Sequence, residues 1–100
     1  MWQDSLSFWN DALRHDADNT FALIDRAACL INDKEIRQRY GISEALAYRQ
    51  ALKDLQKASR RAPRDVDVWK DLAIVYKRLG RMEESAAAHI KFEQLLKVGL

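Results

Sequence analysis

A pattern of small and apolar residues occurs twice in this sequence, at an offset of 34 positions. The first copy comprises Ala51, Leu52, Leu55 and Ala58, and the second comprises Ser85, Ala86, His89 and Phe92. Recurrence at roughly 20 to 50 residues is typical of repeat folds, in which each unit buries its apolar face by stacking on its neighbours. The sequence therefore predicts a stack of similar helical units.

Apolar residues recur with helical spacing in five segments, at about residues 2–14, 20–39, 44–62, 66–79 and 82–97. The segments are separated by residues that cap or break helices, namely Asp18 or Asn19, Gly41, Ser43, Pro63, Asp65 and Gly80. The chain holds 3 Gly and 1 Pro, too few for the turns of an all-β fold. We expect one all-α domain of about five helices. The packing faces of the last two are predicted as Trp69, Leu72, Ala73 and Tyr76, then Met82, Ala86, His89, Phe92 and Leu95 or Leu96.

Composition suits a globular domain and argues against disorder, since 48% of the 100 residues are apolar and 32% are charged. The single Cys29 cannot form an internal disulfide, which fits a reducing compartment. No apolar run approaches the roughly 18 residues of a membrane span, and the first residues do not resemble a secretory signal. We therefore expect a cytoplasmic location without membrane insertion.

Charge is distributed unevenly along the chain. Residues 1–33 contain six Asp and two Arg, a net charge of −4, whereas residues 34–64 contain nine basic and three acidic residues, a net charge of +6. Residues 65–100 balance at six of each sign. Solvated helix faces explain this pattern, and head-to-tail self-association or an acidic partner for the middle segment is the alternative.

No catalytic or cofactor-binding constellation is visible. The sequence lacks a phosphate-binding glycine loop, an H-E-x-x-H motif and a C-x2-C motif. Cys29 lies within an apolar segment and is interpreted as a buried structural residue, and His89 as a packing residue. His15 lies in an acidic stretch where a full set of metal ligands cannot be identified. We expect no enzyme activity, no cofactor and no metal site.

One basic run comprises Lys53, Lys57, Arg60, Arg61 and Arg64. Along one helix face these residues could contact phosphates, but no aromatic residue except Tyr48 is placed to stack on bases. A solvated helix end near the C-terminal dipole is the preferred interpretation, and nucleic-acid binding is disfavoured.

The stretch from Trp69 to Gly80 resembles the first helix of a tetratricopeptide repeat (TPR). Trp69-x2-Leu72-Ala73-x2-Tyr76 is similar to the family pattern W-x2-L-G-x2-Y with Ala for Gly, and Gly80 falls at the family's turn. The 34-residue offset equals the family period. The resemblance implies a right-handed solenoid of antiparallel helix pairs. Its structural signature would be Ala27, Ala58, Trp69, Leu72, Ala73, Tyr76, Gly80 and Phe92.

An earlier copy of this repeat is stretched. Ala27 and Leu30 precede Ala73 and Tyr76 by 46 positions, which is 34 plus 12, and Ala12 precedes Ala58 by the same interval. The spacing predicts a 12-residue insertion within residues 32–47 that lengthens one or both helices. The domain would then comprise a lone second helix (1–14), an extended repeat (20–62) and a regular repeat (66–97).

TPR domains bind peptides or proteins on a concave face formed by the first helices of the repeats. The resemblance places the following residues on that face: Ile24, Ala28, Ile31, Asn32, Asp67, Lys70, Asp71, Ile74, Lys77 and Arg78. Ile24 and Ala28 replace the Lys and Asn of the clamp that binds chaperone tails in some members, so that activity is not implied. The leading hypothesis is a non-catalytic adaptor or scaffold module with a protein or peptide partner.

Neither end of the chain carries the polar cap that solenoids need. The apolar residues at the ends are Trp2, Phe8, Trp9, Ile90, Leu95, Leu96 and Val98. An exposed apolar patch usually marks an interface. The alternative hypothesis is therefore a self-assembling structural protein that forms homo-oligomers through these terminal helices.

Overall fold

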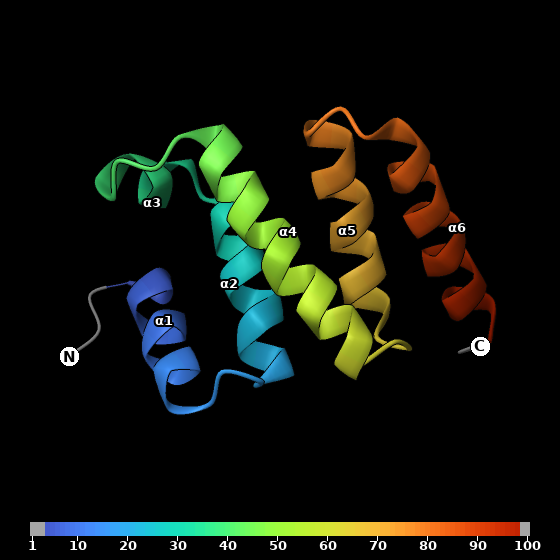
Figure 1. Cartoon of the computed structure of the whole chain (residues 1–100), viewed down its shortest axis with the longest axis horizontal. Helices are drawn as coiled ribbons and strands as arrows, with labels where there is room; N and C mark the ends of the chain where they lie inside the picture. Colours follow the sequence, from blue (N-terminus) through green and yellow to red (C-terminus); the bar gives the residue numbers. More distant parts are fainter. Residues whose placement is uncertain (1–3, 99–100) are drawn as a thin grey trace.

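The computed structural model describes residues 4–98, which form six α-helices and no strand (Figure 1). The helices are α1 (Ser5–His15), α2 (Thr20–Asn32), α3 (Lys34–Arg39), α4 (Glu44–Arg61), α5 (Val66–Arg78) and α6 (Met82–Val98). The all-α prediction is confirmed, and the described residues form one helix more than the sequence predicts.

Five of the helices stand side by side in a row (Figure 1). In the order α1, α2, α4, α5 and α6, each helix packs on the next, and successive helices run in opposite directions. The most extensive contacts join α2 to α4 and α5 to α6. The helices α1 and α6 are therefore the two ends of a molecule that is 40 Å long, and α3 packs on α2 outside the row.

Side-chain caps determine where five of the helices begin. Asp4, Asn19, Asp33, Ser43 and Asp65 each accept a hydrogen bond from a backbone N–H in the first turn of the following helix. Such a bond satisfies an amide that has no partner within the helix. The predicted caps at Asn19, Ser43 and Asp65 are confirmed.

The predicted helix ends also occur where expected. Gly41 and Gly80 have φ angles of 65° and 79°, in the left-handed region that residues with a side chain rarely adopt. Ala62 has φ −133° and ψ 68°, outside the helical region, because the ring of Pro63 follows it. α4 accordingly ends at Arg61.

The prediction of one helix over residues 20–39 is wrong, because Asp33 interrupts it. Asp33 has extended backbone angles, and its carboxylate accepts a hydrogen bond from the Ile36 N–H at 3.0 Å, which starts α3. The buried Arg37 guanidinium then donates to the carbonyl oxygens of Leu30 and Ile31 at 2.9 and 3.0 Å. Carbonyls in the last turn of a helix have no partner within that helix. The extra residues therefore close the end of α2 with a separate helix instead of lengthening it.

The core is concentrated where α2 faces α4. Each of these helices buries a full stripe, whereas α6 buries a single side chain, that of Ala88. Both helices contain alanines without any exposed surface, at Ala22, Ala27, Ala47, Ala51 and Ala58, and such small side chains allow helix backbones to approach closely.

α5 packs through Val68, Leu72 and Val75, which are at most 2% exposed. Leu72 agrees with the prediction, but the remaining predicted residues flank this stripe and are half-buried, namely Trp69, Ala73 and Tyr76. Trp69 Nε1 donates a hydrogen bond to the Pro63 carbonyl at 2.8 Å, so this residue closes the α4–α5 connection. Sequence alone did not distinguish the centre of the stripe from its border.

α6 contacts α5 along one side. Ala88 is buried, Phe92 is half-buried, and Ser85 Oγ donates a hydrogen bond to the Ala73 carbonyl at 2.7 Å. This contact uses small residues, which allow the two helix backbones to approach closely. The rest of α6 is largely exposed.

Candidate functional site

The residues of α2 that were predicted to bind a partner are mostly covered by the chain itself. Ile31 is 2% exposed and belongs to the core, so its side chain offers no surface to a partner. Ile24 and Ala28 are half-buried, and Ile24 packs against the core. Among these four residues, Asn32 is the exposed one.

Arg78, predicted for the same surface, joins α5 to α4. Its Nη1 donates to the Tyr48 hydroxyl at 3.0 Å, and its guanidinium carbon lies 5.6 Å from the centre of the Tyr48 ring. Arg37 of α3 approaches the same ring at 5.9 Å. Cations near an aromatic face are stabilising. Tyr48 is therefore a structural contact shared by α3, α4 and α5. Because the whole residue is only 7% exposed, its ring has no free face on which a base could stack.

Asp67 and Asp71 of α5 form an acidic cluster with Asp25 of α2. Burial raises the pKa of Asp71 to about 6; Lys70 opposes the rise, and Asp67 and Asp25 add to it. Burial and the charge of Asp67 likewise raise the pKa of Asp25. The charged forms of these carboxyl groups are thus disfavoured in the folded protein, and a nearby cation would stabilise them.

Lys70, Ile74 and Lys77, the remaining predicted residues, line a groove between α5 and α6. The groove has a volume of about 530 Å³, and α6 contributes Met82, Ala86, His89 and Phe92 to it. Lys70 and Lys77 are seven positions apart, about two helical turns, so both project from one ridge of α5. Neither lysine forms a hydrogen bond or a salt bridge among residues 4–98, although the charge of Lys70 acts on Asp71, and no carboxylate is among the lining residues. The groove therefore combines an apolar floor with a basic rim.

The α6 face that was predicted to pack on α5 borders this groove instead. Met82 is 56% exposed, and the His89 side chain is 58% exposed and lies 2.8 Å from a carboxylate oxygen of Glu93. The interpretation of His89 as a packing residue is wrong. Because α6 ends the row, α5 covers the side that carries Ala88, and no other described helix covers the neighbouring stripe.

The C-terminal residues predicted for self-association are mostly exposed. Ile90, Leu96 and Val98 are 55%, 44% and 84% exposed, and Leu95 is half-buried. They do not form one continuous patch, because Ile90 lies on the side of α6 opposite Ala88 and Phe92. The groove, rather than this outer side, is where apolar residues of two helices lie together.

An aromatic cluster occupies the N-terminal end of the molecule. Phe8 and Trp9 were predicted there, and Trp2 lies outside the described residues. Phe21, which helical periodicity did not single out, is 69% exposed, and the centre of its ring lies 5.6 Å from that of Trp9. The Phe8 ring lies edge-on to the Trp9 ring, with 4.6 Å between their centres. The aromatic cluster thus comprises Phe8, Trp9 and Phe21. Its signal in the sequence was an aromatic residue two positions after the Asn19 cap.

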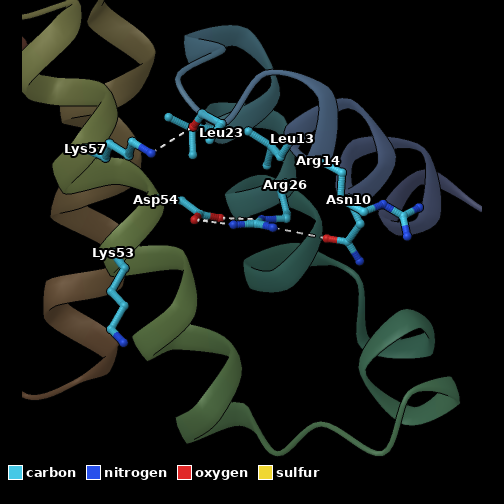
Figure 2. A pocket seen from close by; sticks show the side chains of 9 residues that line it. Asn10, Leu13, Arg14, Leu23, Arg26, Lys53, Asp54 and Lys57 are labelled. Carbon is cyan, nitrogen blue, oxygen red and sulfur yellow. Dashed lines mark hydrogen bonds and ion pairs between the residues drawn. The ribbon is translucent and has the colours of Figure 1, made fainter.

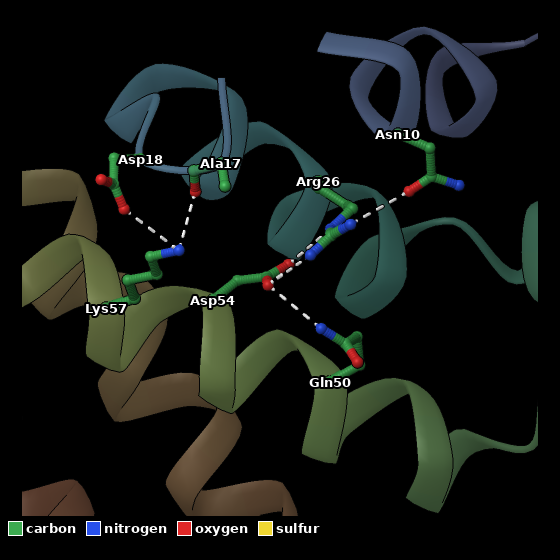
Figure 3. Close-up of polar contacts among 7 residues, drawn as sticks. All are labelled: Asn10, Ala17, Asp18, Arg26, Gln50, Asp54 and Lys57. Carbon is green, nitrogen blue, oxygen red and sulfur yellow. Dashed lines mark hydrogen bonds and ion pairs between the residues drawn. The ribbon is translucent and has the colours of Figure 1, made fainter. Parts of the chain in front are cut away.

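Two members of the basic run contact the connection between α1 and α2. Lys57 Nζ donates to the Ala17 carbonyl at 2.9 Å and lies 3.2 Å from a carboxylate oxygen of Asp18, as Figure 3 shows. Arg61 lies 3.7 Å from the same carboxylate. The acidic first third of the chain and the basic middle therefore neutralise each other in part. The members that remain unpaired within the described residues are Lys53, Arg60 and Arg64.

A smaller pocket of about 280 Å³ lies between α1, α2 and α4 (Figure 2). Four of its lining residues are basic: Arg14, Arg26, Lys53 and Lys57. The side chains of Arg14 and Lys53 point away from its centre in Figure 2, whereas Arg26 and Lys57 are bonded to protein groups. These cations therefore do not converge on a common anion position.

Arg26 and Asp54 form a largely buried ion pair that joins α2 to α4 beside this pocket (Figure 3). Arg26 Nε and Nη2 donate to the two Asp54 oxygens at 2.8 and 2.7 Å, and Arg26 Nη1 donates to Asn10 Oδ1 at 3.2 Å. Gln50 Nε2 donates to Asp54 at 3.1 Å. The residues of the pair are 28 positions apart, so local spacing could not connect them. A carboxylate within the apolar stripe of α4 was the available signal.

Cys29 is half-buried, and burial, aided by the charges of Asp33 and Asp25, raises the pKa of its thiol. The nucleophilic thiolate is thereby disfavoured. His15 is exposed, with Nδ1 2.9 Å from the Asp11 carbonyl oxygen. Within residues 4–98, no group of three or more His, Cys, Asp and Glu residues is placed to hold a metal ion. None of the described helices is long and apolar enough to cross a membrane.

The chain matches no protein-family model, no curated protein and no solved structure. Any functional assignment therefore depends on its own residues and their geometry.

Proposed function

We propose that this chain is a non-catalytic protein-interaction module of the TPR type, and that it binds an apolar helical segment of a protein in the α5–α6 groove. The observation that carries the proposal is the groove itself, with its apolar floor and with Lys70 and Lys77 at its rim. Its volume lies within the range of roughly 300 to 1,000 Å³ that is common for binding sites.

The helix order supports a repeat architecture. α2 with α4 and α5 with α6 are antiparallel pairs, preceded by the single helix α1. The four positions of the 34-residue pattern are buried in α4, whereas in α6, which ends the row, Ser85 and Phe92 are half-buried and Ala86 and His89 are exposed. Two and a half TPR-like repeats, with α3 inside the insertion, account for this arrangement.

A helix is the ligand that suits this site. In a stacked repeat, each helix pair buries one side against the previous pair and offers the other side to the next element. The groove is formed by two adjacent helices, and an amphipathic helix binds such a groove through residues spaced three and four apart. Ile74, Met82 and Ala86 would be the apolar surface that it covers.

Binding can be measured by NMR with a synthetic amphipathic helical peptide that has leucines at positions i, i+3, i+4 and i+7 and glutamates beside them. We expect chemical-shift changes confined to the groove. Ala86→Trp would fill the groove and raise the dissociation constant by about tenfold or more, because the peptide would lose the burial of at least one apolar side chain. Ala87→Trp is the matched control, because Ala87 is also exposed on α6 but does not line the groove.

Equal binding by the Ala86→Trp and Ala87→Trp variants would contradict the proposed site. So would shift changes that centre on α2 and α4. Ala86 and Ala87 are both exposed, so neither substitution disturbs the core, and both variants should fold.

A further inference from the structure

The molecule exposes apolar surface at both ends of its row of helices. At one end, the aromatic cluster of Phe8, Trp9 and Phe21 projects from α1 and the start of α2, and Phe21 is 69% exposed. At the other end, the α5–α6 groove leaves Met82 56% exposed. Exposed apolar groups that lie together on a folded protein usually belong to an interface.

The charges beside the two surfaces have opposite signs. Lys77 borders the groove and has no ionic partner among the described residues, whereas the charge of Lys70 already acts on Asp71 of the same molecule. Asp16 lies in the connection just before α2 and forms no ion pair within residues 4–98, whereas Asp25 already belongs to the acidic cluster with Asp67 and Asp71. The acidic residues that α4 and α3 already neutralise, Asp18 and Asp4, are not needed for this match.

We propose that the α5–α6 groove of one molecule binds the aromatic cluster of a second copy of the chain, head to tail. The inference rests on the proposed function, because it names the protein that occupies the same groove. Phe21 is the central residue, since it is the most exposed aromatic side chain among those described. Asp16 would then approach Lys77 at the border of the contact.

One molecule cannot form this contact within itself. The aromatic cluster belongs to the first two helices of the row and the groove to the last two, and the row extends along the 40 Å axis of the molecule (Figure 1). A contact between two different surfaces leaves one free copy of each surface on every dimer. Association is then open-ended unless the geometry closes a ring.

Two variants separate this arrangement from a symmetric dimer. Phe21→Glu removes the aromatic surface and places an acid in the first turn of α2, where the helix dipole favours it. Ala86→Trp fills the groove. By analytical ultracentrifugation, the unmodified chain should form dimers and larger species as its concentration rises, and each variant alone should remain monomeric. An equimolar mixture of the two variants should form a one-to-one dimer and nothing larger. The Phe21→Glu variant keeps its groove and the Ala86→Trp variant keeps its aromatic cluster, so the dimer uses up both remaining surfaces.

Two further variants test the details. Leu46→Glu is the matched control for Phe21→Glu, because Leu46 is 57% exposed on α4 away from both surfaces, and it should associate like the unmodified chain. Lys77→Glu should raise the dissociation constant by about tenfold through repulsion from Asp16 of the second copy.

A strictly monomeric unmodified chain at its solubility limit would overturn the inference. It would also be overturned if Phe21→Glu still dimerised, which would indicate a groove-to-groove contact, or if the mixture stayed monomeric. The proposed function fails separately, when the synthetic helix does not bind the groove of the monomer.

Discussion

The two halves of the molecule are built differently. Around α2 and α4, side chains from α1 and α3 join the contact, and the Arg26–Asp54 pair and Arg37 tie distant segments together. The contact between α5 and α6 contains no ion pair among the described residues, only the hydrogen bond from Ser85 Oγ to the Ala73 carbonyl, and α6 buries only the Ala88 side chain. Stability is therefore concentrated in the first half, whereas the second half retains uncovered apolar surface.

This difference indicates that one half of the domain mainly stabilises the fold and the other half mainly provides surface for binding. A helix that is covered on several sides holds its neighbours in place but has little surface to offer. A helix that is covered on one side contributes less to stability and keeps a second face for binding. The insertion belongs to the first type, since α3 uses Arg37 to satisfy the end of α2.

The largest expected effect comes from breaking the buried ion pair. Asp54→Ala leaves the Arg26 guanidinium largely buried without its partner, which should lower the free energy of unfolding by about 3–5 kcal/mol. Urea denaturation measures the change. Asp18→Ala is the matched control, because it also removes an Asp that pairs with another helix, but its partner Lys57 is exposed to solvent and little stability should be lost. Similar losses in both variants would show that the buried pair has no special role.

A smaller effect is expected at α3. Arg37→Met keeps the apolar stem but removes the donors that satisfy the Leu30 and Ile31 carbonyls, and should cost about 1–3 kcal/mol. Exchange of the amides in the last turn of α2 should accelerate more than that of α5. Arg39→Met serves as the control, since the Arg39 side chain is 55% exposed and its loss should be milder. Unchanged stability in Arg37→Met would mean that water replaces the guanidinium.

The smallest effect concerns Asp71 of α5, in the acidic cluster that α5 forms with Asp25 of α2. The folded-state pKa of Asp71 is about 6, above its ordinary value of 3.8, so ionisation destabilises the folded form as the pH rises from about 4 to 6. Asp71→Asn should therefore stabilise the protein at pH 7, by about 1 kcal/mol after allowance for solvent screening, and should gain nothing at pH 4. Thermal unfolding at both pH values provides the comparison, and a gain that is equal at both would exclude ionisation as its cause.

Much of the fold could be predicted from local signals. The caps at Asn19, Ser43 and Asp65 and the left-handed glycines Gly41 and Gly80 mark helix boundaries because each acts within a few residues of itself. The helix boundary at Asp33 was not predicted, because residues 34–39 (KEIRQR) themselves favour a helix. The cap that ends the continuous helix works with Arg37, which contacts carbonyls six and seven residues earlier.

The candidate site was harder to predict, because periodicity locates apolar stripes but does not say which element covers them. Met82, Ala86 and His89 form a regular stripe on α6, yet this stripe borders the groove while the neighbouring side, with Ala88, packs on α5. The proposed concave face was similarly divided. Ile31 entered the core and Arg78 bonded to Tyr48, while Lys70, Ile74 and Lys77 remained together.

Amide hydrogen exchange of the unmodified chain at low and high protein concentration tests the central claim most directly. The account predicts that α2 and α4 exchange slowest at both concentrations, and that α6 exchanges fastest at low concentration. At high concentration, exchange should slow selectively in α6 and around Phe21. Protection of α6 equal to that of α4 at low concentration, or protection that does not change with concentration, would contradict it.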